Sequence, residues 1–389
     1  MSGVTHEALL ARARELAPSI ATRVEKTASL RRVPEESFEE FRASGLLRTF
    51  VPAAFGGHGL PLASVIETSR EVSAVCGSSG WCLGICTLHN LMVNGFPEAA
   101  QEEVFGTFSD PVVCGVFMPG GQAVREPGGF RLSGAWNFAS ACDHSDYAIL
   151  AALLLPKAGA SPKGLASFLV RRADFSIEDN WFVAGLEGTG SKRVLVDDLF
   201  VPENWVMPLV EEKVPGGQPM VPTTRGLPTR SVATLGLAGV PLGIAKGALQ
   251  AFQERLAGQL RASNFRGASE RVAAHFRLAE SAAEVDAAEL MVLRDCEEME
   301  HKAAAGQEAS LAERGRYRRD AAFAFHTCAR AVARLLPAAG AHAIFHEGSL
   351  QRAMRDTQVL ATHMVADWDM GRESYARALL DLPVEDPAF

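Results

Sequence analysis

The sequence predicts a mostly helical α+β protein with an N-terminal helical domain, a central antiparallel β-barrel or sandwich and a C-terminal four-helix bundle. Three observations support this fold class. Helical periodicity dominates up to about residue 108, short β-branched or aromatic runs follow as far as 208, and four long amphipathic segments fill most of the remainder. A length of 389 residues suits two or three domains, which we place at 1–108, 109–208 and 209–389.

The first domain is expected to consist of short helices. Residues 5–28 have apolar side chains spaced by three or four, which predicts one amphipathic helix. Pro34 is typical of a helix start and Gly45 of a helix end, so a second helix is expected between them. A further helix is expected at 62–74. The nearly continuous apolar run at 78–93 is too short to span a bilayer and predicts a buried helix.

The composition changes after Asp110. Runs such as PVVCGVFM, GFRLSGAWNFAS and DYAILAALLL are short and rich in β-branched or aromatic residues, and turn residues separate them. Helix-length segments between these runs are missing, which disfavours a parallel sheet built from βαβ units. An antiparallel sheet that ends near Pro208 is therefore expected.

The rest of the chain is helical almost throughout after a loop rich in proline and glycine. The loop, at 204–228, is expected to shape a substrate entrance. Long amphipathic segments with short connections are what a four-helix bundle requires. The four segments are Leu235–Leu260, Ser269–Ala305, Ser310–Leu336 and Leu350–Leu380.

Composition excludes several classes of partner. With 46 Asp+Glu against 38 Lys+Arg, the net charge of −8 argues against nucleic-acid binding, which needs clustered positive charge. Uncharged apolar runs stay short of the roughly 20 residues of a membrane span, and the N-terminus lacks a signal-peptide core. The seven scattered cysteines form no CxxC pair and have no histidine at zinc spacing. We expect a cytoplasmic protein with no metal, membrane or nucleic-acid partner.

Common catalytic motifs are also missing. The sequence has no GxGxxG after a strand, no P-loop, no HExxH and no GxSxG nucleophile elbow. A chain of this size without such a motif is expected, if it is an enzyme, to leave the difficult chemical step to a bound cofactor.

Several stretches together resemble one family. They are VPAAFGGHGLP (51–61), GAWNFASACDHSDYAIL (134–150), GLEGTGSKRVLVDDLFVPE (185–203), LAGVPLGIAKGAL (237–249) and LQRAMRDTQVLATH (350–363). Their order resembles the acyl-CoA dehydrogenase superfamily over nearly the whole chain. The resemblance implies the same three-part fold, in which the central strands frame a flavin.

The glutamate base of an acyl-CoA dehydrogenase has no counterpart in this sequence. In the family this base lies either in a late YEG turn or just before the bundle. Here the late segment reads THMVADWDMGRESYA, and the early position falls on Ala233. Removal of an α-proton from a thioester needs a general base, so dehydrogenation of acyl-CoA is disfavoured.

The sequence does have three polar residues, His89, Ser140 and His363, in stretches that resemble another subgroup of the family. This subgroup is the oxygenase components of two-component flavin-dependent monooxygenases. That subgroup carries W-x-F-A-S-G where this chain has Trp136 to Ala141, and its usual glycine is replaced here by Ala141. A helix that runs from Trp81 to His89, and a histidine of the last helix, His363, also match it.

This resemblance implies a reaction and the roles of its residues. Reduced FMN or FAD, delivered by a separate NAD(P)H-dependent reductase, would react with O2 to give a flavin C4a-hydroperoxide that hydroxylates a phenolic, indolic or polyketide-type aromatic substrate. Ser140 would lie beside the flavin N5. Either His89 or His363 would activate the substrate by taking its proton, and the other would hydrogen-bond the peroxide, because histidine titrates near pH ~6.5.

The resemblance also implies cofactor contacts and assembly. The candidate cofactor-binding residues are Trp81, Trp136, Phe138, Ser140, Gly190, Ser191, Arg261 and Arg266, and a homotetramer is expected. Most of the candidate site residues also have a structural alternative. Ser140 is also typical of a hydroxyl at a strand end that bonds to the backbone. The histidines and tryptophans are also typical of a core, residues 188–191 of an ordinary hairpin turn, and the arginines of a solvated helix end.

Two other functions stay open at this point. One is a flavin oxidase or an atypical acyl-CoA dehydrogenase of the same fold. The other is a non-catalytic helical assembly protein that has lost its flavin. The sequence leaves the substrate and the choice between FMN and FAD undecided.

Overall fold

The computed structural model describes residues 3–209, 226–262 and 272–389. The N-terminal part is helical up to Thr107, as predicted. Its helices are α1 (His6–Thr22), α2 (Val24–Leu30), α3 (Glu35–Ser44), α4 (Leu62–Ser73), α5 (Gly77–Val93) and α6 (Glu98–Thr107), with short 3-10 turns at Leu46–Arg48 and Ala53–Phe55.

One predicted helix is divided. Residues 5–28 form not one helix but α1 and the start of α2, because Arg23 leaves helical geometry at φ −104° and ψ 5°. The two boundaries taken from sequence signals are confirmed. Pro34 immediately precedes α3, and Gly45 ends it in the left-handed conformation at φ 73°.

The strands form one mixed sheet rather than the purely antiparallel one expected. Within the described residues the order is β5-β6-β2-β1-β3-β4-β7. The bounds are β1 (Val113–Glu126), β2 (Gly129–Ala139), β3 (Tyr147–Leu155), β4 (Gly164–Arg171), β5 (Ser176–Glu178), β6 (Lys192–Pro202) and β7 (Val206–Leu209). All pairs are antiparallel except β1 and β3, which run parallel with Val113 opposite Tyr147.

The parallel pair has a simple origin. A parallel connection usually needs a helix as its crossover. Here β2 itself makes the excursion, because it pairs with one side of β1 before the chain crosses at 140–146 to pair β3 with the other side. The lack of helix-length segments between the strands therefore does not exclude a parallel pair.

Trp136 is at the centre of the sheet's core. Its side chain is buried, and its indole Nε1 donates to the carbonyl of Ala151 at 2.7 Å. Gly120, Gly121 and Gly134 leave the space that its ring fills, since a Cβ on any of them would come within 2.8 Å of the ring. Strands from both halves of the sheet share this core, which shows that the sheet curls around it.

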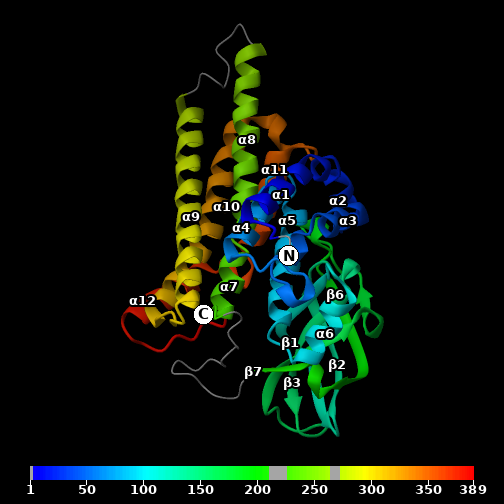
Figure 1. Cartoon of the computed structure of the whole chain (residues 1–389). Helices are drawn as coiled ribbons and strands as arrows, with labels where there is room; N and C mark the ends of the chain where they lie inside the picture. The colour runs from blue at the N-terminus through cyan, green and yellow to red at the C-terminus, as the bar shows by residue number, and fades with distance from the viewer. Residues whose placement is uncertain (1–2, 210–225, 263–271) are drawn as a thin grey trace.

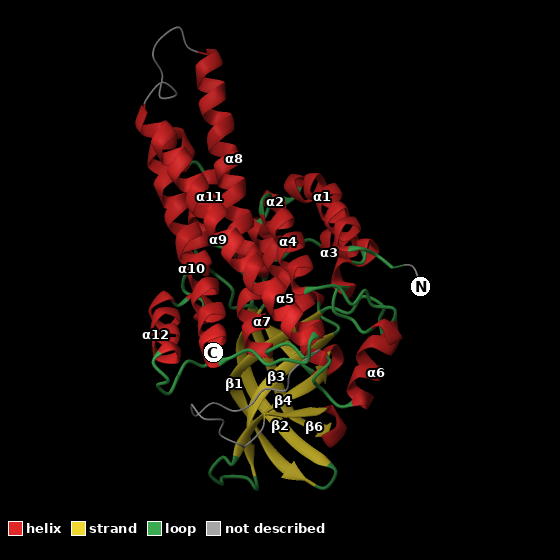
Figure 2. Ribbon diagram, turned by 60° about the vertical axis from the view of Figure 1, so that its left-hand side comes forward, coloured by secondary structure: helices red, strands yellow, loops and turns green. Residues whose placement is uncertain are grey.

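The C-terminal part is a helical bundle, as predicted. Its helices are α7 (Thr229–Gly236), α8 (Gly239–Ala262), α9 (Val272–Ala304), α10 (Leu311–Leu335), α11 (Ser349–Leu360) and α12 (Trp368–Leu379), with 3-10 turns at Leu336–Ala339, Ala341–Ile344 and Met364–Ala366. Figure 1 shows α8, α9 and α10 side by side, and in Figure 2 the sheet lies below the helices.

Two predicted bundle helices are interrupted. The segment predicted to start at Leu235 begins inside α7 and continues as α8. The last segment, predicted as continuous from Leu350 to Leu380, is broken at 361–367, where the side chain of Asp367 caps α12 by accepting from the backbone N–H of Met370. An N-cap starts a new helix locally, and helical periodicity does not reveal such a break.

One stretch of the bundle is apolar enough to span a bilayer by length and composition. It is Thr229–Gly258, with a mean hydropathy of 1.5 in its most apolar window, yet 78% of that window is buried within the fold. Its apolar character is therefore accounted for by its place in the core.

A glycine seam joins the N-terminal helices to the bundle. Three glycines of α8 at four-residue spacing face α4, so the two backbones approach closely. A Cβ on Gly239, Gly243 or Gly247 would lie 2.2, 2.2 and 2.0 Å from the carbonyl oxygens of Ile66, Arg70 and Ala74, respectively. No side chain fits there, so α4 and α8 pack in this arrangement only with glycine at the three positions.

This seam gives a test of the packing. Gly243→Ala is expected to destabilise the fold by about 1–3 kcal/mol, because the added methyl group forces the helices apart. Gly258→Ala, on the same helix but with open space around its Cα, is expected to stabilise by up to about 1 kcal/mol through helix propensity. Urea denaturation measures both. Equal effects of the two substitutions would contradict the seam.

Candidate functional site

The site is centred on Ser140, which follows the end of β2 and is buried. The indole Nε1 of Trp81, on α5, donates to the Ser140 Oγ at 2.9 Å. The Ser140 Oγ lies 2.8 Å from that of Ser191, which in turn lies 2.8 Å from the Oγ1 of Thr189. The fold thus brings together three of the residues that the sequence singled out, from three distant segments.

The hydrogen-bond chain has a direction. The Thr189 hydroxyl donates to the carbonyl of Leu186 at 2.9 Å, and a hydroxyl has only one hydrogen to give. Ser191 must therefore donate to Thr189, and Ser140 to Ser191. Ser140 consequently accepts from Trp81, keeps one lone pair for a ligand, and donates to a ligand only by releasing Ser191.

The backbone around Ser140 is constrained. Phe138 and Ala141, on either side of it, adopt left-handed conformations with φ values of 69° and 60°. The Ala141 N–H donates to the carbonyl of Thr189 at 2.9 Å, which ties the turn to the 185–191 loop. A left-handed residue favours glycine, which is the residue that the resemblance implies at this position. Ala141 keeps the turn, with its methyl group buried.

His363 lies beside Trp81, but not within the last helix as predicted. It stands in the break between α11 and α12, and its ring meets the Trp81 ring edge-on, with centroids 5.2 Å apart. Its Nδ1 accepts from the backbone N–H of Val365 at 3.3 Å, so the neutral ring carries its hydrogen on Nε2. Burial, together with the positive charge of Arg318, lowers the pKa of His363 to about 4.

His89 has the opposite tautomer. It lies on α5 eight residues beyond Trp81, a rise of about 12 Å, and is buried against β1. Its Nδ1 is 2.8 Å from the carbonyl of Val113, so Nδ1 carries the hydrogen and Nε2 presents a lone pair. Burial lowers the pKa of His89 to about 4, which keeps it neutral. Its ring also meets the half-exposed Phe117 at 5.6 Å.

The remaining predicted cofactor residues have different environments. Trp136 is enclosed in the sheet core, which favours its structural alternative over contact with a cofactor. Phe138 is 71% exposed and touches Trp181 edge-on. Gly190 has a left-handed φ of 52° in the turn before β6. Arg266 and the side chain of Arg261 lie outside the described residues.

Asp356 is a residue that the sequence analysis did not single out as functional. Its buried carboxylate accepts from the backbone N–H of Leu186 at 2.6 Å and so holds the loop that carries Thr189 and Ser191. Burial raises the pKa of Asp356 to about 6. The sequence signal for Asp356 was its place after Arg355 in the last of the stretches that resemble the family. This signal is weak, because an acidic residue in an amphipathic helix is ordinarily exposed to solvent.

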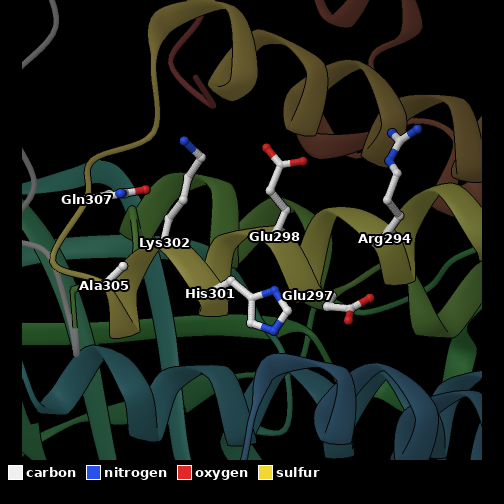
Figure 3. A pocket seen from close by; sticks show the side chains of 7 residues that line it. All are labelled: Arg294, Glu297, Glu298, His301, Lys302, Ala305 and Gln307. Carbon is white, nitrogen blue, oxygen red and sulfur yellow. The ribbon is translucent and has the colours of Figure 1, made fainter.

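A depression of about 430 Å³ lies along α9, away from this site. It is lined by Arg294, Glu297, Glu298, His301, Lys302, Ala305 and Gln307. In Figure 3 Arg294, Glu298 and Lys302 point to one side of α9, and Glu297 and His301 to the other. The ion pairs that neutralise the first group are Arg294–Asp320, Glu298–Arg316 and Lys302–Glu313. Partners within the protein thus already account for these charges.

The chain matches two family models. "Acyl-CoA dehydrogenase, N-terminal domain" matches residues 4–105, and "Acyl-CoA dehydrogenase, C-terminal domain" matches residues 235–368. A relative from Rhizobium sp. (strain MTP-10005), the oxygenase component of an FADH2-dependent resorcinol hydroxylase, is 33% identical, with 97% of this chain and 95% of the relative covered.

Two solved structures share the whole fold. The crystal structure of 3-HSA hydroxylase from Rhodococcus sp. RHA1 matches with a TM-score of 0.91 at 28% identity, covering 99% of this chain and 100% of that one. XiaF from Streptomyces sp., in complex with FADH2 and glycerol, also matches with a TM-score of 0.91 at 28% identity, covering 98% and 97%. These matches confirm the predicted fold and family.

The buried His89 makes the stability of the protein depend on pH. Its pKa is about 4 in the fold, against ~6.5 in an unfolded chain. The stability that the neutral ring contributes is therefore complete above pH ~6.5 and is lost as pH falls through the folded pKa. Between pH 7.5 and 5.0 the unmodified protein should lose about 2 kcal/mol more unfolding free energy than His89→Gln.

Urea denaturation at the two pH values measures this difference. Asp356, with its raised pKa, contributes the opposite slope, since its stability is lost as pH rises through about 6. That contribution is present in both proteins and cancels in the comparison. An equal loss in the two proteins would show that His89 is not held neutral by burial.

Proposed function

The chain belongs to the acyl-CoA dehydrogenase superfamily and, within it, to the oxygenase components of flavin-dependent monooxygenases, and on that premise we propose that it hydroxylates an aromatic substrate with reduced flavin and O2. The observation that carries the proposal is the pairing of a buried hydroxyl chain at Ser140 with two neutral histidines of opposite tautomer. A separate NAD(P)H-dependent reductase supplies the reduced flavin.

The residues around Ser140 suit a flavin. A flavin ring needs a flat apolar surface and hydrogen-bond partners at its polar edge. Two exposed apolar side chains lie close in sequence to the buried polar groups: Phe138 is two residues before Ser140, and Met364 directly follows His363. Trp81, Ser140 and Ser191 would hold the ring, and the bound flavin would supply the electrons and activate oxygen.

The tautomers assign a separate role to each histidine. His89 presents a lone pair at Nε2, so it can accept the proton of a phenol or another acidic aromatic group. His363 presents an N–H at Nε2, so it can donate a hydrogen bond to an oxygen atom bound beside Trp81. One ring thus offers an acceptor and the other a donor, which suits hydroxylation of a phenol whose hydroxyl proton is shared with the acceptor.

Exclusion of water is the third contribution of the protein. Trp81, His89 and Ser140 are all at most 6% exposed. In such a site hydrogen bonds are stronger and reactive oxygen species are shielded from side reactions with water. The protein therefore binds and orients the flavin and the substrate and excludes water from them.

Acyl-CoA dehydrogenation remains disfavoured by the site. Ala233, at the early position of the family's base, is a partly buried apolar residue packed with the cluster around Phe96 and Met207. The segment that replaces the YEG turn includes the His363 break and the start of α12 instead. A flavin oxidase or a non-catalytic protein would need neither the base at His89 nor the donor at His363.

We also propose the identity of the flavin, the class of substrate, the assembly and the location of the protein. FAD is preferred to FMN because two of the similar proteins are named with FADH2. The similarity to a relative named as a resorcinol hydroxylase supports a phenolic substrate for this protein. The long amphipathic helices of the bundle support a homotetramer, and seven buried cysteines without a disulfide support a cytoplasmic protein.

The function is tested with the purified protein, photoreduced FAD, O2 and a panel of phenols that includes resorcinol. Hydroxylated product is expected, measured as product formed per reduced FAD consumed. His89→Ala should lower the rate of product formation by about 100-fold or more, because it removes a general base, while reduced FAD is still consumed. His342→Ala, an exposed residue remote from Trp81 in the sequence, is the control.

Ser140→Ala should affect a different quantity. Loss of this hydroxyl removes a partner for the flavin and for Trp81, so product per reduced FAD should fall and released hydrogen peroxide should rise. If the unmodified protein leaves reduced FAD to oxidise at its free-solution rate, with no product from any phenol, the proposed function is wrong.

A further inference from the structure

Arg318 on α10 is a charged residue with only 1% of its surface exposed. Its Nε donates to the carboxylate of Asp386 at 2.7 Å. Its two terminal nitrogens donate to the carbonyls of Val365 at 2.8 Å and Met364 at 3.0 Å, with Asp367 further away at 3.4 Å. The planar guanidinium therefore joins the C-terminal segment to the break between α11 and α12.

Asp386 is held as firmly as its partner. It is 2% exposed, accepts from the hydroxyl of Ser374 at 2.9 Å and accepts from the backbone N–H of Ala388 at 2.8 Å. Val384 and Phe389, on either side of it, are also buried. Because an unpaired charge is costly in such a place, Arg318 and Asp386 each depend on the other.

The carbonyls that Arg318 binds belong to the turn that His363 begins. That turn is Met364–Ala366, and His363 is its N-cap residue. The backbone N–H of Val365 bonds to the His363 Nδ1, while the carbonyl of the same residue bonds to Arg318. The guanidinium thus fixes the peptide groups that orient the imidazole, and its charge opposes protonation of that ring.

We propose that Arg318, paired with Asp386, is a positioning residue for His363, so that the C-terminal segment 381–389 governs the site from a distance. The role of His363 in hydroxylation rests on the proposed function, whereas its placement by Arg318 does not. Arginine suits this task because its fork of donors reaches several acceptors at once, which the single ammonium of lysine does not.

The charged groups around the turn are few in the described part of the chain. Arg318 faces it from α10 and Asp386 from the C-terminal segment, while Asp367 lies at its end, with its carboxylate on the backbone N–H of Met370. Trp81, from α5, presents an uncharged ring. Removal of the Arg318 charge should therefore make His363 easier to protonate.

The test separates charge from geometry with two substitutions. In ¹⁵N-histidine spectra of the full chain, the His363 signal is identified by its loss in His363→Gln. Arg318→Met should shift that signal and raise its titration midpoint by about one pH unit or more. Arg318→Lys should keep the midpoint near that of the unmodified protein but still displace the signal. Product per reduced FAD should fall about tenfold or more in both.

Arg372→Met is the matched control, since Arg372 is an exposed arginine of α12 whose partner Asp369 is on the same helix. It should leave the His363 signal and product formation unchanged. If Arg318→Met does not fold, Asp386→Asn replaces it and should displace the His363 signal while the His89 and His144 signals stay in place. An unmoved His363 signal in the folded variants would overturn the proposal.

The two proposals fail in different ways. If His363 moves as expected but the unmodified protein forms no product, the proposed function is wrong and the positioning role stands. If product forms but His363 keeps its signal and its midpoint without Arg318, the positioning role is wrong and the proposed function stands.

Discussion

The glycine seam between α4 and α8 is the packing constraint on which the rest of the molecule depends. It places the N-terminal helices against the bundle at backbone distance. The next helix, α5, begins four residues after α4 ends, at Gly77, where a Cβ would come within 2.9 Å of both Ile244 of α8 and Asp356 of α11. The start of α5 is therefore fixed against both α8 and α11. This places Trp81, on the first turns of α5, between Ser140 at the end of β2 and His363 in the break after α11.

The chemistry of the site follows from this close packing. Each buried polar group there has a partner that settles where its hydrogen lies, from the indole of Trp81 through three hydroxyls to the carbonyl of Leu186. The same principle gives His89 and His363 opposite tautomers, because one faces a carbonyl and the other an N–H. Burial then keeps both rings neutral, so the fold fixes a base and a donor in advance of any ligand.

Buried charges hold the segments that carry these groups. Asp356 binds the 185–191 loop through the N–H of Leu186, and Arg318 binds the turn that begins at His363. Buried charges contribute little net stability, but removing one partner is costly, so they favour a single arrangement of the loops around them. Both bind backbone groups of the segments around Trp81, so they act on the geometry of the site rather than on a substrate.

The sequence by itself determined the order of helical and β segments and the helix boundaries at Pro34 and Gly45. Through the resemblance to a known family it also named Trp81, Ser140 and His363 as candidate site residues, and the structure places these three beside one another. Periodicity and end signals are local, so one segment is enough to display them. Only the tertiary structure decided the parallel pairing of β1 with β3, the break at 361–367, the burial of Trp136 in the sheet core and the tautomers of the two histidines. Most of these depend on a partner outside the local segment: β3 beside β1, Ala151 for the Trp136 indole, Val113 for His89, and Arg318 on the turn at the break. The tautomer of His363 and the start of α12 are set nearby, by the N–H of Val365 and the side chain of Asp367. No local pattern records which distant group will occupy that place, because it is set by the packing of the whole chain.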